Sequence, residues 1–276
     1  MPSLDPLVLL SYAAAVTSRA RLGISVLVFP LHNPVSVARQ VGSLDVASGG
    51  RAVLGIGSKS APYAAFGLPS DRRVQRFLEG VEVMTALWIE KRAQFNGEFY
   101  RLDGAPMEPK PVHKPHPPIW MGGSHPNVLK RAVQVANGWM GAGGSSLDEF
   151  MKLASQLREI LERSGRDRST FTVSKRIYLA VDSDSARARR KLREAYHALY
   201  GNPDAADRQC LWGSPAECAE RLEALVSTGV DHLLLHPVYD LEEQLEAVAA
   251  VVGLASSERS SGSTAVSQPA NRTGRR

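Results

Sequence analysis

The chain has 276 residues, of which 43% are hydrophobic, so it is long enough and apolar enough to bury a large core. Its formal net charge of +5 does not indicate a nucleic-acid partner, because four arginines and one glutamate from Leu254 onward supply +3 of it and leave +2 for the rest. No apolar run approaches the roughly twenty residues of a membrane span, and no basic leader precedes an apolar stretch, so we expect a cytoplasmic protein with no membrane partner.

The first third of the chain predicts helices and strands in strict alternation. A helix is expected at residues 6–17, and an apolar, β-branched strand follows at 21–29. Asn33 and the proline after it predict the cap of the next helix, which ends at two glycines. A buried strand is then expected at 52–57, and Ser70 opens a longer helix with one apolar stripe. This order is typical of a parallel sheet covered by helices.

An insertion at residues 89–117 interrupts the alternation. Residues 94–104 predict a β-hairpin, because they contain the turn pairs Asn-Gly and Asp-Gly. Residues 105–118 hold six prolines and should run as extended chain. A long segment without secondary structure is usually functional or covers something, so we expect this one to act as a lid over the ligand end.

Residues 117–144 predict a strand, a turn, a helix and a second strand. The strand at 118–121 leads into a Gly-Gly-Ser turn, with Ser124 or His125 as the cap of the helix, and the strand at 138–142 runs into a second glycine-rich turn. Such turns direct free N–H groups and the positive end of a helix dipole at one point, so a phosphate is a natural ligand. The simpler alternative is that both are ordinary turns. The candidate anion-binding residues are Gly122, Gly123, Ser124, Gly141, Gly143 and Gly144.

The C-terminal half continues the alternation. Strands are expected at 172–182 and 231–236, and two helices open with capping boxes, one at Ser146 and one at Ser214. In all, the chain predicts about six parallel strands, each followed by a helix. This pattern gives either a doubly wound sheet or a (β/α)8 barrel.

One domain and a tail are expected from this organisation. Residues 1–253 form the predicted barrel domain, in which two of the eight strands of a complete barrel are missing. Residues 254–276 are rich in Ser, Arg, Gly and Thr and predict a disordered tail.

Four segments, taken in order, resemble those of one family. They are residues 17–58, 65–88, 109–144 and 233–240, which begin TSRARLGI, AFGLPSDR, PKPVHKPH and LLLHPVYD. The set resembles the bacterial-luciferase-like superfamily of flavin- and deazaflavin-dependent oxidoreductases, and the likeness extends over about residues 6–252. The resemblance implies an α/β fold of the TIM (β/α)8 barrel type that binds FMN or coenzyme F420 at the carboxyl ends of its strands.

The resemblance also assigns roles to short segments. Ser25 and Val26 match the position of a non-proline cis peptide bond that supports the flavin ring. Gly57 and Ser58 match a segment that bonds to the ring edge or the tail. The two glycine-rich turns match the segments that hold the coenzyme phosphate, in agreement with the anion site that their glycines indicate.

Two features depart from the family pattern. Ser60 stands where some deazaflavin dehydrogenases of the family carry a glutamate as proton donor. Family members also place a strand, a helix and a second strand before the helix at residues 6–17, so the expected barrel lacks its first β-α-β segment. Either the true start lies upstream, or the open edge pairs with a partner.

Two histidines are the candidate catalytic residues. His32 follows the third strand of the family pattern and His236 ends the eighth, although a lone histidine is more often structural. No spacing among the histidines indicates a metal site.

The expected function is that of a luciferase-like monooxygenase or dehydrogenase, an oxidoreductase that uses FMN or F420 on a small organic substrate. An alternative is a truncated barrel with weak catalysis that serves as a binding or partner subunit. A phosphosugar-type barrel enzyme would use the same anion site, but the ordered family segments do not favour it. A homodimer is the expected assembly.

Overall fold

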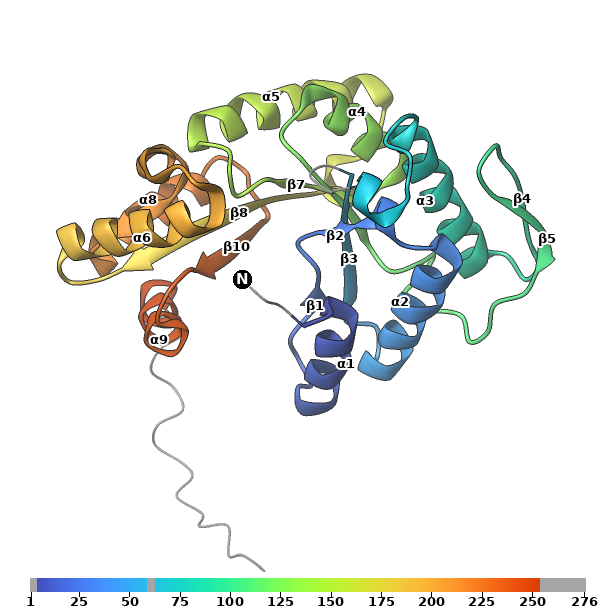
Figure 1. Ribbon diagram of the computed structural model, residues 1–276, viewed down its shortest axis with the longest axis horizontal. Coiled ribbons are helices and arrows are strands. Elements are labelled where there is room, and N and C mark those ends of the chain that lie inside the picture. Colours follow the sequence, from blue (N-terminus) through green and yellow to red (C-terminus); the bar gives the residue numbers. More distant parts are fainter. Residues whose placement is uncertain (1–3, 59–62, 254–276) are drawn as a thin grey trace, which may run out of the picture.

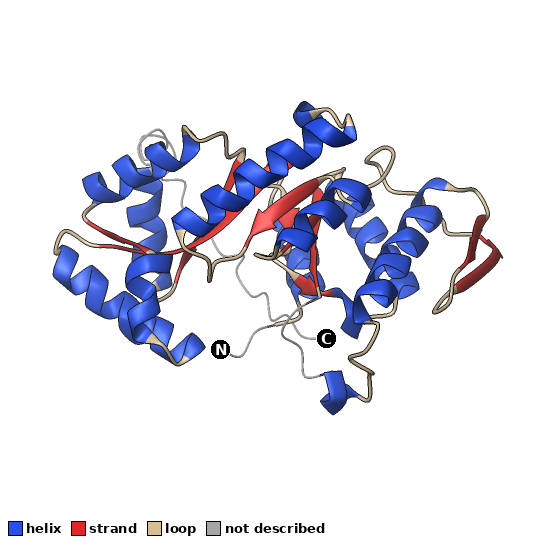
Figure 2. Cartoon of the chain, turned by 90° about the horizontal axis from the view of Figure 1, so that it is seen from above, coloured by secondary structure: helices blue, strands red, loops and turns tan. Residues whose placement is uncertain are grey.

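The computed structural model describes residues 4–58 and 63–253. They form a curled parallel sheet whose outer face is covered by helices, which confirms the predicted α/β class (Figures 1 and 2). The predicted tail at 254–276 and Ser60 lie outside the described residues. Among the described helices, none has both the length and the apolar character needed to cross a membrane.

The sheet has the strand order β1, β3, β6, β7, β8, β10, and two short strands extend it, β2 beside β3 and β9 beside β8. The bounds are Leu22–Gly23 (β1), Leu27–Val28 (β2), Ala52–Gly57 (β3), Ile119–Gly122 (β6), Gly138–Gly141 (β7), Thr172–Val181 (β8), Leu211–Gly213 (β9) and His232–Pro237 (β10). All these pairs are parallel, and no strand of the described residues pairs with the outer side of β1 or β10. The sheet is therefore a half-barrel that is open between β10 and β1 (Figure 1), as the count of about six parallel strands predicts.

Two details of the sheet differ from the prediction. The strand expected at 21–29 is divided into β1 and β2 by residues 24–26, where the peptide bond between Ser25 and Val26 is cis. β9 was not expected, because three residues are too few to show a period of two.

The helices begin where their caps predict in most cases. Their bounds are Pro6–Val16 (α1), Pro34–Ser48 (α2), Arg73–Ile89 (α3), Pro126–Val135 (α4), Leu147–Ser164 (α5), Ser185–Tyr200 (α6), Ala206–Gln209 (α7), Pro215–Val226 (α8) and Leu241–Val251 (α9). The Asn33 side chain accepts two backbone N–H groups of α2, and the capping boxes at Ser146 and Ser214 both form. The start of α3 differs: it begins after Arg72, which has a φ of 54°, and not at Ser70.

The core lies between the outer face of the sheet and the helices. Leu54, Ile56, Ile119, Met121 and Trp139 point to this side, and each is at most 3% exposed. Full burial of such a side chain contributes about 1.5–3 kcal/mol. The alternate residues of the same strands face the concave side, where Val53, Trp120 and Met140 form a second, smaller apolar cluster.

The hairpin predicted at 94–104 is present. β4 (Ala93–Asn96) and β5 (Arg101–Ala105) are antiparallel and stand at one extreme of the molecule beside α3 (Figures 1 and 2). Arg72 pairs with Glu98 in the hairpin turn, and Phe99 N donates to Glu79 Oε2 at 2.8 Å. The hairpin is thus fixed to the N-terminal half of α3.

The expectation that the proline-rich segment acts as a lid over the ligand end is wrong. His113 N donates to Asp45 Oδ2 at 2.9 Å, and Lys110 Nζ donates to the carbonyl oxygen of Leu87 at 2.8 Å. Asp45 and Leu87 lie in the last turns of α2 and α3, next to the amino-terminal ends of the strands, since α2 ends just before β3 begins. The segment therefore crosses the end of the sheet opposite the predicted ligand site. Its prolines predict extended chain, but its place depends on a buried carboxylate far away in the sequence.

We expect Asp45→Ala to loosen this segment. The Asp45 side chain is fully buried, and its Oδ1 lies 3.6 Å from His113 Nδ1. Alanine would leave the part-buried His113 N–H without an acceptor, which should lower the free energy of unfolding by about 1–3 kcal/mol. Urea denaturation measures the loss, with Glu159→Ala on the exposed face of α5 as control. A loss no larger than that of the control would contradict the anchoring role.

Candidate functional site

Two turns lie side by side at the carboxyl ends of β6 and β7. We call residues 122–124, at the end of β6, the serine turn and residues 142–145, after β7, the glycine turn. Gly122 is paired with Met140 in the parallel register, and Gly123 N donates to the Met140 carbonyl oxygen at 3.1 Å. Trp139 Nε1 donates to the Gly123 carbonyl oxygen at 2.8 Å. The structure thus brings the two turns to the same end of neighbouring strands.

Both turns present backbone N–H groups that donate to no group of the described protein. These are the amides of Gly143 and Gly144 in the glycine turn and of Ser124 in the serine turn. The serine turn leads into α4, and His125, one of the two expected caps, accepts the Asn127 N–H at its Nδ1 at 3.2 Å. Free amides and the positive end of a helix dipole together favour an anion. A phosphate-bearing coenzyme tail therefore fits the donors that are present.

Val26 lies over the ends of β3 and β6 on the concave side. A Cβ atom at Gly57 would lie 2.9 Å from Val26 Cγ2, and one at Gly122 would lie 2.7 Å from Val26 Cγ1. Only glycine leaves room at these two positions. The Ser25 carbonyl oxygen, next to the cis peptide bond, accepts a hydrogen bond from Arg176 Nη1 at 2.7 Å. The predicted ring-supporting segment is thus cis and contacts both glycines.

β8 contributes Arg176 and Tyr178, which were not predicted as site residues. The Arg176 guanidinium carbon lies 4.7 Å from the centre of the Tyr178 ring, and burial lowers the pKa of Arg176. The hydroxyl oxygens of Tyr178 and Tyr200 are 2.5 Å apart, and the Tyr178 ring centre lies 5.0 Å from that of His236. The period of two from Ser174 through Arg176 to Tyr178 could have revealed this face of β8.

The two candidate catalytic histidines are in different surroundings. His236 lies beside Tyr178, and its pKa is lowered by burial and by the charge of Arg176. His32 follows β2 and donates its backbone N–H to the Phe29 carbonyl oxygen at 2.9 Å; burial lowers its pKa, while Asp5 acts in the opposite direction. Among the described contacts, none joins the two histidines. Both side chains favour the neutral form near pH 7, which can accept a proton.

Ser58, the other residue expected near the coenzyme ring, follows β3 at the same end of the sheet. Its carbonyl oxygen accepts a hydrogen bond from the Tyr63 hydroxyl at 2.6 Å. Ser58 is partly buried. The backbone at the end of β3 is therefore held in place by a residue from the following segment.

Lys175 points to the other side of β8 and lies beneath the glycine turn. Its side chain is fully buried, and its Nζ donates to the carbonyl oxygens of Ala142 and Ser145 at 2.5 and 2.8 Å and to Ser145 Oγ at 2.9 Å. Burial lowers the pKa of Lys175 from 10.5 to about 7, against the opposing effects of Cys210 and Glu149. No ion pair joins Lys175 to a carboxylate of the described residues.

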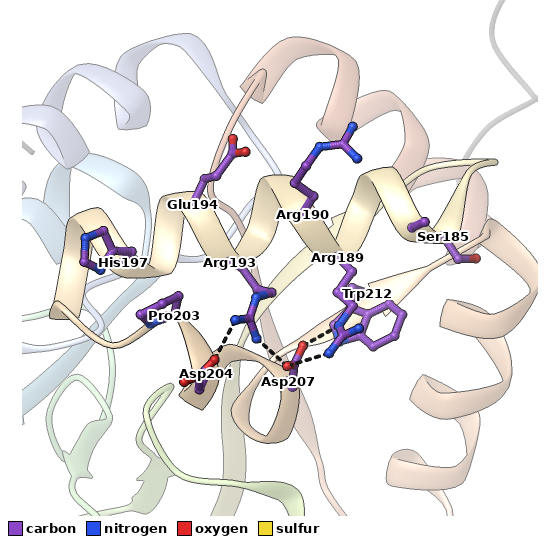
Figure 3. Close-up of a pocket in the computed structure, with 11 residues that line it drawn as sticks. Ser185, Arg189, Arg190, Arg193, Glu194, His197, Pro203, Asp204, Asp207 and Trp212 are labelled. Carbon is purple, nitrogen blue, oxygen red and sulfur yellow. Dashed lines mark hydrogen bonds and ion pairs between the residues drawn. The ribbon is translucent and has the colours of Figure 1, made fainter.

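A groove of about 960 Å³ lies elsewhere, along α6. Figure 3 shows that Arg189 and Arg193 both reach Asp207, at 2.8 and 2.5 Å, and that Arg193 also reaches Asp204. Because carboxylates already neutralise these arginines, the groove offers less to an anion than the free amides at the strand ends. The strand-end site is the stronger candidate.

The family model described as luciferase-like monooxygenase matches residues 1–232. The chain belongs to this family. A protein from Kineococcus radiotolerans named F420-dependent glucose-6-phosphate dehydrogenase is 32% identical to this luciferase-like chain over 257 residues, which cover 83% of the chain and 76% of that protein. An uncharacterised protein of Mycobacterium tuberculosis is 35% identical over 167 residues, and that match covers 60% of the chain and 57% of the relative's length.

A solved structure also resembles this luciferase-like protein. The monooxygenase RslO1 from Streptomyces bottropensis has a TM-score of 0.79 and 26% sequence identity, with 91% of this chain and 83% of that chain covered. The sequence resemblance to the luciferase-like superfamily and the barrel-type fold are therefore confirmed.

The two central residues of the glycine turn should respond differently to substitution in this luciferase-like protein. A Cβ atom at Gly143 would lie 2.7 Å from the Tyr178 ring, whereas one at Gly144 would lie 3.7 Å from the Tyr196 hydroxyl oxygen. We expect Gly143→Ala to lower the free energy of unfolding by about 1–3 kcal/mol and Gly144→Ala to change it by less than about 0.5 kcal/mol. Denaturant unfolding measures both. Equal effects would contradict the packing of Tyr178 on this turn.

The stability of the ligand-free protein should rise with pH because of Lys175. The unfolded chain keeps the lysine proton up to about pH 10.5, whereas the folded protein releases it above about 7. Within this window the unfolded state binds more protons, so a higher pH favours folding, by up to roughly 5 kcal/mol in total. Denaturant unfolding between pH 6.5 and pH 9.5, in roughly one-unit steps, should show this rise in the wild type and not in Lys175→Met.

Lys152→Met is the matched control for this experiment, since Lys152 is exposed on α5. Its pH profile should follow that of the wild type. If all three proteins show the same profile, Lys175 does not change its charge on unfolding.

Proposed function

We propose that this protein is an oxidoreductase that binds FMN or coenzyme F420 and acts on a small organic substrate. The observation that carries the proposal is the pair of turns at the carboxyl ends of β6 and β7, whose amides are free to bind an anion. Both coenzymes combine a flat ring system with a phosphate-bearing tail, so they need a floor for the ring and donors for the phosphate. Membership of the luciferase-like family and the F420-dependent relative support this choice.

Each part of the coenzyme has candidate contacts at this end of the sheet. Ser25, Val26, Gly57 and Ser58 would support the ring. The residues proposed to hold the phosphate are Gly122, Gly123, Ser124, Gly141, Gly143 and Gly144. A bound coenzyme of this kind supplies hydride transfer or activation of oxygen, and the protein supplies orientation and a site from which water is excluded.

His236 and Arg176 are the side chains that we propose for the chemistry on the concave face. The lowered pKa of His236 keeps the imidazole neutral near pH 7, so that it can take up a proton from a substrate. Arg176 provides a fixed positive charge, partly buried, that can stabilise developing negative charge. His32 is the second candidate for proton transfer.

We propose that residues 1–253 act as one barrel domain and that the protein is a cytoplasmic homodimer. Val8, Tyr12 and Val16, spaced by four residues on α1, are 68, 70 and 64% exposed and form an apolar stripe. A contiguous exposed apolar surface is typical of a protein interface. Both cysteines are buried free thiols, which agrees with a reducing compartment.

Fluorescence titration of the purified protein with FMN and with F420 tests the proposed function. We expect saturable binding of one coenzyme, and Gly122→Val should abolish it, because any side chain at this position overlaps Val26. The absorbance of the bound coenzyme should change on turnover, and glucose 6-phosphate is the first substrate to try, given the named activity of the Kineococcus relative.

Lys152→Met serves as the control for binding, and circular dichroism shows whether Gly122→Val remains folded. If the wild type binds neither coenzyme, the proposal is wrong and the alternative of a non-catalytic partner subunit is favoured.

A further inference from the structure

Lys175 has a fully buried amino group that forms no ion pair with a carboxylate of the described residues. Burial raises the pKa of the nearby Cys210 thiol to about 12, so this group stays neutral. Glu149 on α5 is exposed and bonds to the backbone N–H of Ser146 at 2.8 Å, and the neighbouring Arg176 adds a second positive charge. A charge removed from water is costly unless it is paired. Glu149 is thus a nearby anion, but no carboxylate of the described residues lies within ion-pair distance of the Lys175 ammonium group.

The glycine turn is built around the Lys175 ammonium group. The Nζ atom bonds to the carbonyl oxygens of Ala142 and Ser145, the two ends of the turn, and Ser145 N donates to the Ala142 carbonyl oxygen at 3.2 Å. The carbonyl oxygens at both ends of the glycine turn are therefore directed toward Lys175. The amides of Gly143 and Gly144 lie between them in the chain and have no partner among the described residues.

We propose that Lys175 positions the glycine turn for the phosphate of the coenzyme and supplies the positive charge that this phosphate neutralises. The inference rests on the proposed function. Lys175 acts through the turn, so it is a positioning residue and not a catalytic one. An anion bound above the turn favours the charged form of the lysine, so binding of the coenzyme takes up a proton where Lys175 is otherwise partly neutral.

The role of Lys175 is tested by comparing the dissociation constants of ligands that carry the phosphate-bearing tail with those of ligands that lack it. F420 is compared with its deazaflavin chromophore without the tail, and FMN is compared with riboflavin, which lacks the phosphate. In Lys175→Met we expect the dissociation constant of the tailed coenzyme to rise by roughly tenfold, while that of the tail-free partner stays within about twofold of the wild type. Fluorescence titration gives all values, and Lys152→Met should behave as the wild type.

The wild type offers a second test that needs no substitution. The preference for F420 over its tail-free chromophore should fall by roughly tenfold between about pH 6 and pH 9, as Lys175 loses its proton. Groups of the ring system that titrate are common to both ligands, so they cancel in the ratio of the two dissociation constants. This measurement decides the question if Lys175→Met does not fold.

The outcomes separate the two proposals. If the wild type binds no tailed coenzyme, the proposed function itself fails. If the wild type prefers the tailed coenzyme and Lys175→Met keeps that preference, or the wild-type preference is constant with pH, the role of Lys175 is overturned while the proposed function stands.

Discussion

The whole arrangement depends on how closely residues 24–26 approach the strands beside them. A Cβ atom at Gly55 would lie 1.9 Å from the Ile24 carbonyl oxygen, and Cβ atoms at Gly57 and Gly122 would overlap Val26. Three positions without side chains thus allow one segment to lie across two strands. The outer faces of the same strands are packed against helices, so the sheet cannot move away from this contact. One sheet therefore packs helices on its convex face and holds residues 24–26 on its concave face.

Local signals in the sequence predicted most of the fold. Asn33 and Ser146 mark helix starts by the hydrogen bonds that their own side chains make, and these need no knowledge of the tertiary structure. The period of apolar residues gave the strands for the same reason. The sequence did not reveal the side on which residues 105–118 lie, because this depends on Asp45, which is more than sixty positions away in the chain.

The candidate site was predicted in part. The glycine pattern predicted the two turns, and the family resemblance predicted the cis peptide bond. The structure shows that bond and brings those turns together, but their binding of a coenzyme stays a prediction. Lys175 and Arg176 were not predicted as site residues, because neighbouring charges on a strand usually indicate a solvated edge. Here they point to opposite faces of a central strand, one beneath a turn and one onto the concave side. The environment of each charge is set by segments that pack against β8, the glycine turn for Lys175 and Ser25 for Arg176, and these are distant in the sequence.

The proline-rich segment gives the two ends of the half-barrel different mechanical characters. At the amino-terminal end, the segment bonds to α2 through Asp45 and to α3 through Lys110, and so reinforces a helix pair that Trp88 Nε1 also joins by donating to the Ala38 carbonyl oxygen. We refer to this crossing segment as a strap. The carboxyl end carries no such strap among the described residues, and its loops are free to differ in length and composition. Changes in selectivity can therefore accumulate at one rim while the opposite rim preserves the scaffold.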